Sequence, residues 1–203
     1  MSTVNVSVIY YSATGTTQAM AERLAAAAEK QGAEVRLRHV DELAPKEAIE
    51  SQDDWVEHRK DIEGKPTATP DDVVWADVVL FGTPTRFGNI ASQLQQFLDT
   101  LGPQWAAGDL ADKVYAGFTT SQTAHGGQES TLLSLYHVIH HFGGLVVSPG
   151  YTDPVKFADG NPYGVSHVTG ADNDAPLTEV EVSALDHMAE RAVDYARRLK
   201  ASA

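Results

Sequence analysis

The stretch Val4-Asn-Val-Ser-Val-Ile-Tyr-Tyr-Ser-Ala-Thr-Gly-Thr-Thr17 decides the fold. Its first half is an apolar run rich in valine and isoleucine, which is typical of a buried strand and stops at Ser12. Hydroxyl side chains and one glycine fill the next positions. Apolar residues then recur at helical spacing, at Met20, Ala21, Leu24, Ala25 and Ala28. The stretch therefore predicts a strand, a short polar loop and a helix.

The polar loop between this strand and helix suits a phosphate group. The first N–H groups of a helix have no intrahelical acceptor, and the helix dipole adds positive potential at the same point. Ser12, Thr14, Thr16 and Thr17 add hydroxyl donors without adding charge. Neither Gly-x-Gly-x-x-Gly nor the lysine of a Walker loop is present, so a phosphorylated ligand other than ATP is predicted. An ordinary turn with a hydroxyl capping the helix explains the same residues, and that alternative stays open.

Composition narrows the class of protein. The 203 residues predict one domain over 1–203, and the absence of cysteine excludes disulfides and thiolate chemistry. The formal net charge of −13 disfavours direct binding to nucleic acid. Neither a signal peptide nor an apolar run of membrane-spanning length is recognisable, so we expect a cytoplasmic protein without membrane contact.

The pattern of strand, loop and helix repeats along the chain. Further strands are predicted at 33–40, near a sheet edge, and at 77–82, 113–118 and 145–147. Helices are predicted from 70, over 90–101 and 128–142, and near the C-terminus over 185–199. Residues 41–69 are expected to form a surface loop with a short helix, anchored by packing of Trp55. A turn is expected at 102–108, and 149–176 is a glycine- and proline-rich segment. The alternation predicts a doubly wound, five-stranded parallel sheet in a three-layer α/β/α sandwich.

Three polar loops fall at one edge of this predicted sheet. They occupy 12–17, 83–89 and 119–127, after the first, third and fourth strands. Ligands of such folds bind outside the carboxyl ends of the strands, so these loops are expected to hold one ligand together. Pro84 stiffens the second loop, Phe87 offers an apolar plate, and Arg86 and Asn89 offer polar contacts. The ligand is therefore expected to be longer than a phosphate and planar at one end.

The second loop also carries a family resemblance. Gly82-Thr-Pro-Thr-Arg-Phe-Gly-Asn89 resembles a flavin-binding loop of the WrbA proteins, flavodoxin-like NAD(P)H:quinone oxidoreductases once described as Trp-repressor-binding proteins. Other matches follow in the family's order, at Tyr10-Tyr-Ser12, Trp105-Ala-Ala-Gly108, Gly126-Gly-Gln-Glu129, His140-His141 and Pro162-Tyr-Gly164. The resemblance thus extends over essentially the whole chain.

The resemblance implies FMN as the cofactor. It places the phosphate at Ser12, Ala13, Thr14, Gly15, Thr16 and Thr17, the ring against Thr83, Pro84, Thr85, Arg86, Phe87 and Asn89, and the polar edge of the ring at Thr119, Thr120, Ser121, Gln122, Thr123, Gly126 and Gly127. His141, with His140 as the alternative register, matches a flavin-site histidine, and Trp105 matches the aromatic that covers the nicotinamide and quinone position. Thr14 replaces a tyrosine that many members carry beside the nicotinamide, so the resemblance leaves the nucleotide preference open.

The activity implied by the resemblance is two-electron reduction of quinones to hydroquinones by NADH or NADPH through FMN. One open ring face predicts ping-pong kinetics, and the family implies a homotetramer whose sites include residues of neighbouring subunits. His137, His140 and His141 lack the further ligand that zinc requires, so no metal is expected. The alternatives are a flavodoxin-type electron carrier and a non-catalytic regulatory binding module. Trp105 and the 162–164 insertion favour the enzyme over the electron carrier, and the acidic charge and the absence of a DNA-reading motif argue against a regulatory module that contacts an operator directly.

Overall fold

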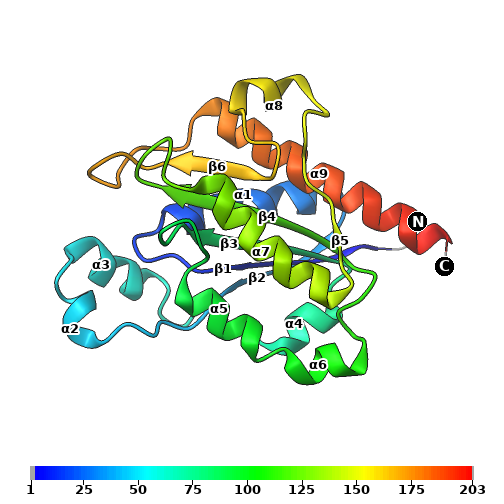
Figure 1. The fold of residues 1–203 in the computed structure, drawn as a ribbon, viewed down its shortest axis with the longest axis horizontal. Helices are drawn as coiled ribbons and strands as arrows, with labels where there is room; N and C mark the ends of the chain where they lie inside the picture. Colours follow the sequence, from blue (N-terminus) through cyan, green and yellow to red (C-terminus); the bar gives the residue numbers. More distant parts are fainter. Residues whose placement is uncertain (1–2, 203) are drawn as a thin grey trace.

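A parallel sheet organises the computed structural model, which describes residues 3–202. The strands are β1 (Asn5–Tyr10), β2 (Glu34–His39), β3 (Val78–Pro84), β4 (Val114–Ser121), β5 (Leu145–Val146) and β6 (Val165–Val168). The helices are α1 (Thr16–Lys30), α2 (Lys46–Ile49), α3 (Asp53–Asp61), α4 (Pro70–Trp75), α5 (Ser92–Asp99), α6 (Gly102–Ala107), α7 (Gln128–Phe142), α8 (Pro154–Asp159) and α9 (Glu179–Ser202). The strand order is β2-β1-β3-β4-β5, with β6 also paired to β4 (Figure 1). This confirms the predicted doubly wound fold.

The last edge of the sheet is built from two separate pieces. Val114 and Tyr115 of β4 pair with β5, whereas Phe118 to Ser121 pair with β6, and both pairings are parallel. Residues 147–164 leave the sheet between the two pieces and include α8. The edge strand is therefore interrupted by an excursion, and its second half flanks the end of β4 that leads into the third polar loop.

Two hydrophobic cores lie on the two faces of the sheet. Side chains alternate along β3, so that Leu80 belongs to one core and Phe81 to the other. The first core is closed by α1 and α9, through residues such as Leu24 and Met188. The second is closed mainly by α5 and α7, through residues such as Leu94 and Leu132. This distribution gives the predicted three layers.

The structure departs from the predicted elements in a few short segments. The range 102–108 was predicted as a turn but contains α6, because a proline in the first turn starts a helix and Gly108, at φ 82°, caps it. The range 149–176 contains α8 and the sixth strand, which the prediction of five strands lacked. β6 has four residues and buries only Val165 and His167 fully, too short a pattern to stand out in the sequence. Two short helices, α2 and α3, occupy 41–69, where a loop with one was expected.

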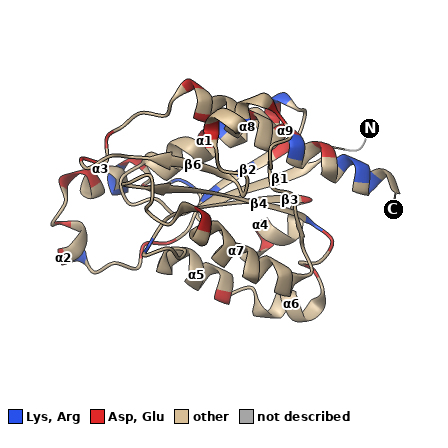
Figure 2. Cartoon of the chain, turned by 45° about the horizontal axis from the view of Figure 1, so that its top comes forward, with Lys and Arg blue, Asp and Glu red and all other residues tan. Residues whose placement is uncertain are grey.

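Charged side chains lie mainly on the surrounding helices and loops, whereas β3 and β4 in the middle of the sheet carry none (Figure 2). Uncharged central strands are expected where helices cover both faces of a parallel sheet. Over residues 3–202, no helix combines the length and the apolar character needed to cross a membrane.

Candidate active site

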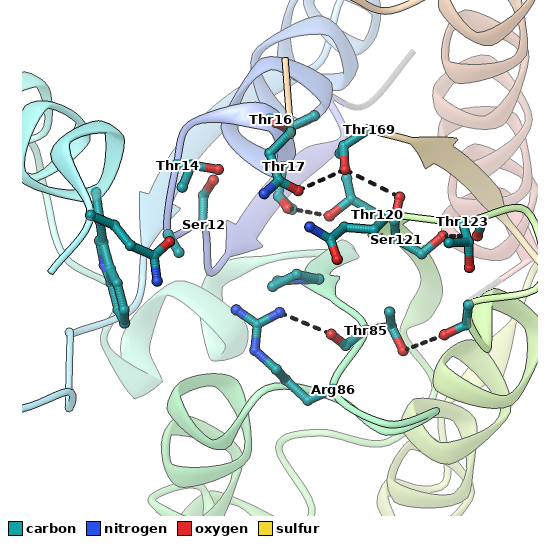
Figure 3. Close-up of a pocket in the computed structure, with 17 residues that line it drawn as sticks. Ser12, Thr14, Thr16, Thr17, Thr85, Arg86, Thr120, Ser121, Thr123 and Thr169 are labelled. Atoms are coloured by element: carbon teal, nitrogen blue, oxygen red, sulfur yellow. Dashed lines mark hydrogen bonds between the residues drawn. The ribbon is translucent and has the colours of Figure 1, made fainter. Parts of the chain in front are cut away.

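A cavity of about 430 Å³ opens at the edge of the sheet where the three polar loops meet (Figure 3). The first loop contributes Ser12, Ala13, Thr14, Thr16 and Thr17, the second Pro84, Thr85 and Arg86, and the third Thr120, Ser121, Gln122, Thr123 and Gly126. Its walls carry many hydroxyl groups and one guanidinium group but no carboxylate. The structure therefore brings the three predicted loops together around one polar space.

The backbone of the first loop forms a tight turn before α1. Gly15 precedes α1 with φ 97°, a left-handed conformation that glycine adopts without strain. Its N–H donates to Ser12 Oγ at 3.0 Å, which holds the turn closed. The first turn of α1 carries no acidic side chain, so the positive end of the helix dipole is not neutralised there. Thr17 Oγ1 lies 3.1 Å from Thr120 Oγ1 and ties this loop to the third.

His58 of α3 lies behind the first loop. A Cβ atom at Gly15 would be 3.5 Å from His58 Nδ1, so the imidazole packs against the turn. Burial lowers the pKa of His58 and outweighs the opposing charge of Asp61, so the ring is neutral at pH 7. The positive potential at the first loop therefore comes from the helix and its N–H groups rather than from His58.

The second loop ends in a tight hairpin. The N–H of Arg86 donates to Asn89 O at 2.8 Å, and the N–H of Asn89 donates to Arg86 O at 3.0 Å. Phe87 and Gly88 form the turn at φ 53° and 79°, the positive values of a type I′ hairpin. The Phe87 side chain is fully exposed at the tip, away from the cavity wall. Its role as an apolar plate therefore remains a prediction. It would require a ligand ring that extends out of the cavity, or another subunit, to contact Phe87.

Thr85 joins the second loop to the third. Its hydroxyl donates to Gly126 O at 3.2 Å and accepts from Thr131 at 2.8 Å and from the N–H of Gly88 at 3.2 Å. The two backbones also touch, since a Cβ atom at Gly127 would lie 2.8 Å from Gly88 Cα. The second and third loops are thus joined into one cradle, which fixes the positions of the groups on this part of the cavity wall.

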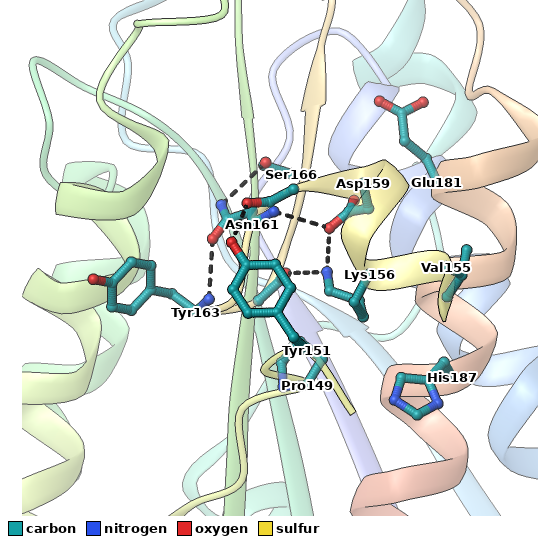
Figure 4. A network of polar contacts seen from close by, with 12 residues as sticks. Pro149, Tyr151, Val155, Lys156, Asp159, Asn161, Tyr163, Ser166, Glu181 and His187 are labelled. Atoms are coloured by element: carbon teal, nitrogen blue, oxygen red, sulfur yellow. Dashed lines mark hydrogen bonds and ion pairs between the residues drawn. The ribbon is translucent and has the colours of Figure 1, made fainter. Parts of the chain in front are cut away.

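The third loop is supported from outside the cavity by a chain of polar contacts. Gln128 Nε2 donates to Ser121 Oγ at 2.8 Å, and Gln128 Oε1 accepts from Ser166 Oγ at 3.1 Å. Asn161 Nδ2 then donates to Ser166 at 3.1 Å, and the N–H of Asn161 donates to Asp159 at 3.3 Å. Figure 4 shows how these contacts lead from Ser166 to α8. The excursion of residues 147–164 is therefore connected to the cavity wall.

A buried ion pair lies at the end of this chain of contacts. The Lys156 ammonium contacts Asp159 Oδ2 and donates to Gly164 O at 2.9 Å, and both side chains are almost completely buried. Burial raises the pKa of Asp159 and lowers the pKa of Lys156, against the attraction between them. Among the described residues, Asp159 Oδ1 has no hydrogen-bond partner. Removing either side chain would therefore leave the other as an uncompensated buried charge, which is strongly destabilising.

His167 of β6 holds the segment that carries Thr169 and Asn173, two further residues of the cavity wall. Its Nδ1 lies 2.9 Å from Glu181 Oε1 and its Nε2 2.9 Å from Ala175 O, so a doubly protonated ring donates to both. Burial opposes this charge, but the hydrogen bond and charge of Glu181 outweigh burial and raise the pKa of His167. When it is protonated, the ring therefore stabilises this wall.

We expect His167→Gln to lower the free energy of unfolding by about 2 kcal/mol at pH 6. Because the folded-state pKa is raised, the stabilisation is complete below the unfolded value of about 6.5 and is lost as pH rises through the folded value. Urea unfolding at pH 6 and pH 8.5 measures this difference, with His187→Gln on α9 as the control. A His167→Gln effect that is independent of pH would contradict the assignment.

Trp105 and His141 lie together but far from the cavity. Trp105 Nε1 donates to His141 O at 2.8 Å, which joins α6 to the end of α7. α7 starts beside the cavity at Gln128 and runs away from it, and a rise of about 1.5 Å per residue puts His141 about 20 Å from that start. α6 and α3 lie at opposite ends of the sheet in Figure 1. Within one chain these two residues cannot face a ligand in the cavity.

The remaining predicted residues lie around the cavity rather than on its wall. Thr83 and Thr119 support the loops, since Thr83 Oγ1 accepts from the N–H of Ala91 and Thr119 Oγ1 donates to Thr83 O. Asn89 lines a neighbouring groove of about 500 Å³. Four wall residues were not predicted as site residues, namely Gln52, Trp55, Thr169 and Asn173. They come from segments expected to be loops, where no local pattern marks a binding residue.

Comparisons with known proteins agree on one group. The family model described as NADPH-dependent FMN reductase matches residues 4–154. A NAD(P)H dehydrogenase (quinone) of Deinococcus radiodurans is 43% identical over 197 residues, covering 97% of each chain. One of Sinorhizobium fredii is 40% identical over 186 residues, covering 88% of this chain and 90% of the relative. A solved flavodoxin, WrbA-like protein from Agrobacterium tumefaciens has a TM-score of 0.68 at 26% identity, covering 97% of this chain and 99% of that one.

Proposed function

This chain belongs to the WrbA-like NAD(P)H dehydrogenases (quinone) within the FMN reductase family, and on that premise we propose that its 430 Å³ cavity is the FMN site. The protein is an FMN-dependent NAD(P)H:quinone oxidoreductase. The observation that carries the site assignment is the meeting of the α1 N-terminus with two hydroxyl-rich loops around one cavity.

The residues present fit FMN. A phosphate binds at the α1 N-terminus, where Thr14, Thr16 and Thr17 offer hydroxyl groups and the helix offers its N–H groups. Arg86 lies on the opposite wall, its Nη1 donating to Thr85 O at 2.9 Å, and its charge favours an electron-rich ring. The Thr85 contacts hold the second loop against the third, and the Thr17–Thr120 contact ties the third loop to the first. When bound, FMN supplies the redox chemistry between the nicotinamide and the quinone, while the chain supplies binding and orientation.

Direct assays test the function and the cofactor together. We expect purified protein to release FMN on boiling, identified by chromatography, and to oxidise NADH or NADPH with benzoquinone. Initial rates at varied concentrations of both substrates should give parallel double-reciprocal lines, because one open ring face cannot hold both. Protein that carries FMN but turns over neither substrate would point to an electron carrier instead.

We further propose a homotetramer, acting in the cytoplasm, in which Trp105 and His141 complete the cavity of a neighbouring subunit. Trp105 is half exposed and its indole is held by His141 O, at the end of the sheet remote from its own cavity. An exposed, oriented aromatic of this kind suits the nicotinamide and quinone position of another subunit.

Trp105→Ala should raise the Michaelis constants for quinone and NADH roughly fivefold while FMN remains bound, since an aromatic contact is worth about 1 kcal/mol beyond burial. Unfolding and mixed refolding of this variant with Gly127→Ala, whose cavity is damaged, should restore part of the wild-type activity. Such recovery requires that one subunit supplies the indole and another the cavity. Unchanged kinetics in Trp105→Ala, or mixed protein no more active than its components, would refute the shared site.

A further inference from the structure

Trp55 occupies a position that packing alone does not explain. It lies on α3, yet it lines the FMN cavity together with Thr14 and Arg86. With Arg86 it also borders the adjoining groove of about 500 Å³. Neither hydrophobic core includes Trp55, whereas Trp75 packs against the second core. Trp55 was expected to anchor a surface loop by packing, but it forms part of the wall between the cavity and the adjoining groove.

The indole is held in place by Glu42. Glu42 Oε2 accepts from Trp55 Nε1 and from Tyr11 OH, each at 2.9 Å. Glu42 Oε1 accepts from Gln93 Nε2 at 2.7 Å and from the N–H groups of Leu43 and Ala44 at 2.9 Å. Burial opposes the charge of this carboxylate, but these hydrogen bonds outweigh it and lower the pKa of Glu42.

This arrangement ties the indole to the rest of the site. Tyr11 directly precedes the first polar loop, and Gln93 lies on α5 below the second. Glu42 thus joins the indole to the supports of both loops through one carboxylate. A side chain immobilised in this way presents its ring face without a further loss of rotamer entropy when a ligand arrives.

We propose that Trp55 is a specificity-determining residue whose indole forms the aromatic wall for a flat, electron-poor ring in the cavity. This rests on the proposed function, because the rings at hand are the isoalloxazine of FMN and the nicotinamide or quinone ring that stacks on it. Offset contact of an indole with such a ring is favourable beyond the area buried. A wall of this kind selects planar ligands over aliphatic ones of equal size.

Two substitutions and one control test the proposal. Trp55→Leu removes the ring, Trp55→Phe keeps a ring but loses the bond to Glu42, and Trp75→Phe changes a tryptophan whose ring stacks on Arg36 at 4.0 Å instead. Thermal unfolding checks that each variant is folded. FMN affinity is measured by titration and the fluorescence lifetime of bound FMN by time-resolved emission. The Michaelis constants are measured by steady-state kinetics.

The results distinguish whether the indole contacts the isoalloxazine or the ring that stacks on it. If the indole faces the isoalloxazine, Trp55→Leu weakens FMN binding roughly five- to tenfold and lengthens the fluorescence lifetime, since tryptophan quenches flavin emission by electron transfer. If it faces the second ring, FMN binding is unchanged and the Michaelis constants for NADH and quinone rise by a similar factor. Trp55→Phe should lie between Trp55→Leu and wild type, and Trp75→Phe should match wild type.

The proposal is overturned if folded Trp55→Leu matches Trp75→Phe in FMN affinity, lifetime and both Michaelis constants. It is also overturned if Trp55→Phe and Trp55→Leu are equally impaired, because the ring face would then contribute nothing. Wild-type protein that binds no FMN would instead refute the proposed cofactor site, so the two failures are distinguishable.

Discussion

Lys156→Met lowers the free energy of unfolding by about 3–5 kcal/mol at pH 7, because it leaves a buried carboxylate without its counter-charge. Asp159 in the variant keeps a raised pKa and must be protonated to stay buried, while the unfolded value is about 3.9. Protonation becomes costlier as pH rises, so the destabilisation grows from pH 5 to pH 8. Urea unfolding at both pH values measures the effect.

A double variant separates lost charge balance from lost packing. Lys156→Met combined with Asp159→Leu removes both charges, and replacing a buried pair by apolar side chains is often neutral or stabilising. We therefore expect the double variant to recover most of the stability and to lose the pH dependence. If Lys156→Met cost less than about 1 kcal/mol, the pair would contribute little to holding α8.

Gly127→Ala is expected to weaken FMN binding and reduce kcat/KM by roughly 100-fold, since displacing a site by about 1 Å costs a factor of this size. The new methyl group would lie 2.8 Å from Gly88 Cα and 3.2 Å from Gly88 N, both backbone atoms that cannot rotate away. The second and third loops must then separate, which breaks the cradle that Thr85 closes.

The positive φ of Gly127, 89°, adds a conformational cost of about 1–2 kcal/mol that is unrelated to the site. Gly64→Ala provides the matched control, because Gly64 has φ 79° and nothing within 4 Å of a new methyl group. Both variants should lose stability through the positive φ, Gly127→Ala more because of its clash with Gly88, whereas only Gly127→Ala should lose FMN affinity in a fluorescence titration. Equal FMN affinities in the two variants would show that the loops tolerate separation.

The polar loops were predictable because each follows a strongly apolar strand. β3 is almost entirely apolar and β1 is polar only at Asn5 and Ser7, and the abrupt change at Ser12 and Thr83 marks the carboxyl edge of the sheet. The doubly wound arrangement then brings these loops together, as the structure confirms. The family motif at 82–89 added the cofactor, which periodicity alone does not specify.

The unpredicted part of the cavity comes from segments without periodicity. Trp55 and Gln52 belong to 41–69, where charged residues and prolines hide a nine-residue helix. Thr169 follows a four-residue strand whose pairing with β4 depends on the excursion before it. Trp105 and His141 match the family motif, yet the fold places them at the far end of α7, and a linear sequence cannot show that they lie far from the cavity of their own chain.

The two edges of the sheet have a consequence for the protein in concentrated solution. β2 exposes one edge and alternates Glu34, Arg36 and Arg38 along its length. The opposite edge is split into β5 and β6, of two and four residues, with α8 between them in the chain. Charged and interrupted edges make poor templates for a strand of another molecule. The fold thereby resists edge-to-edge aggregation without needing a closed barrel.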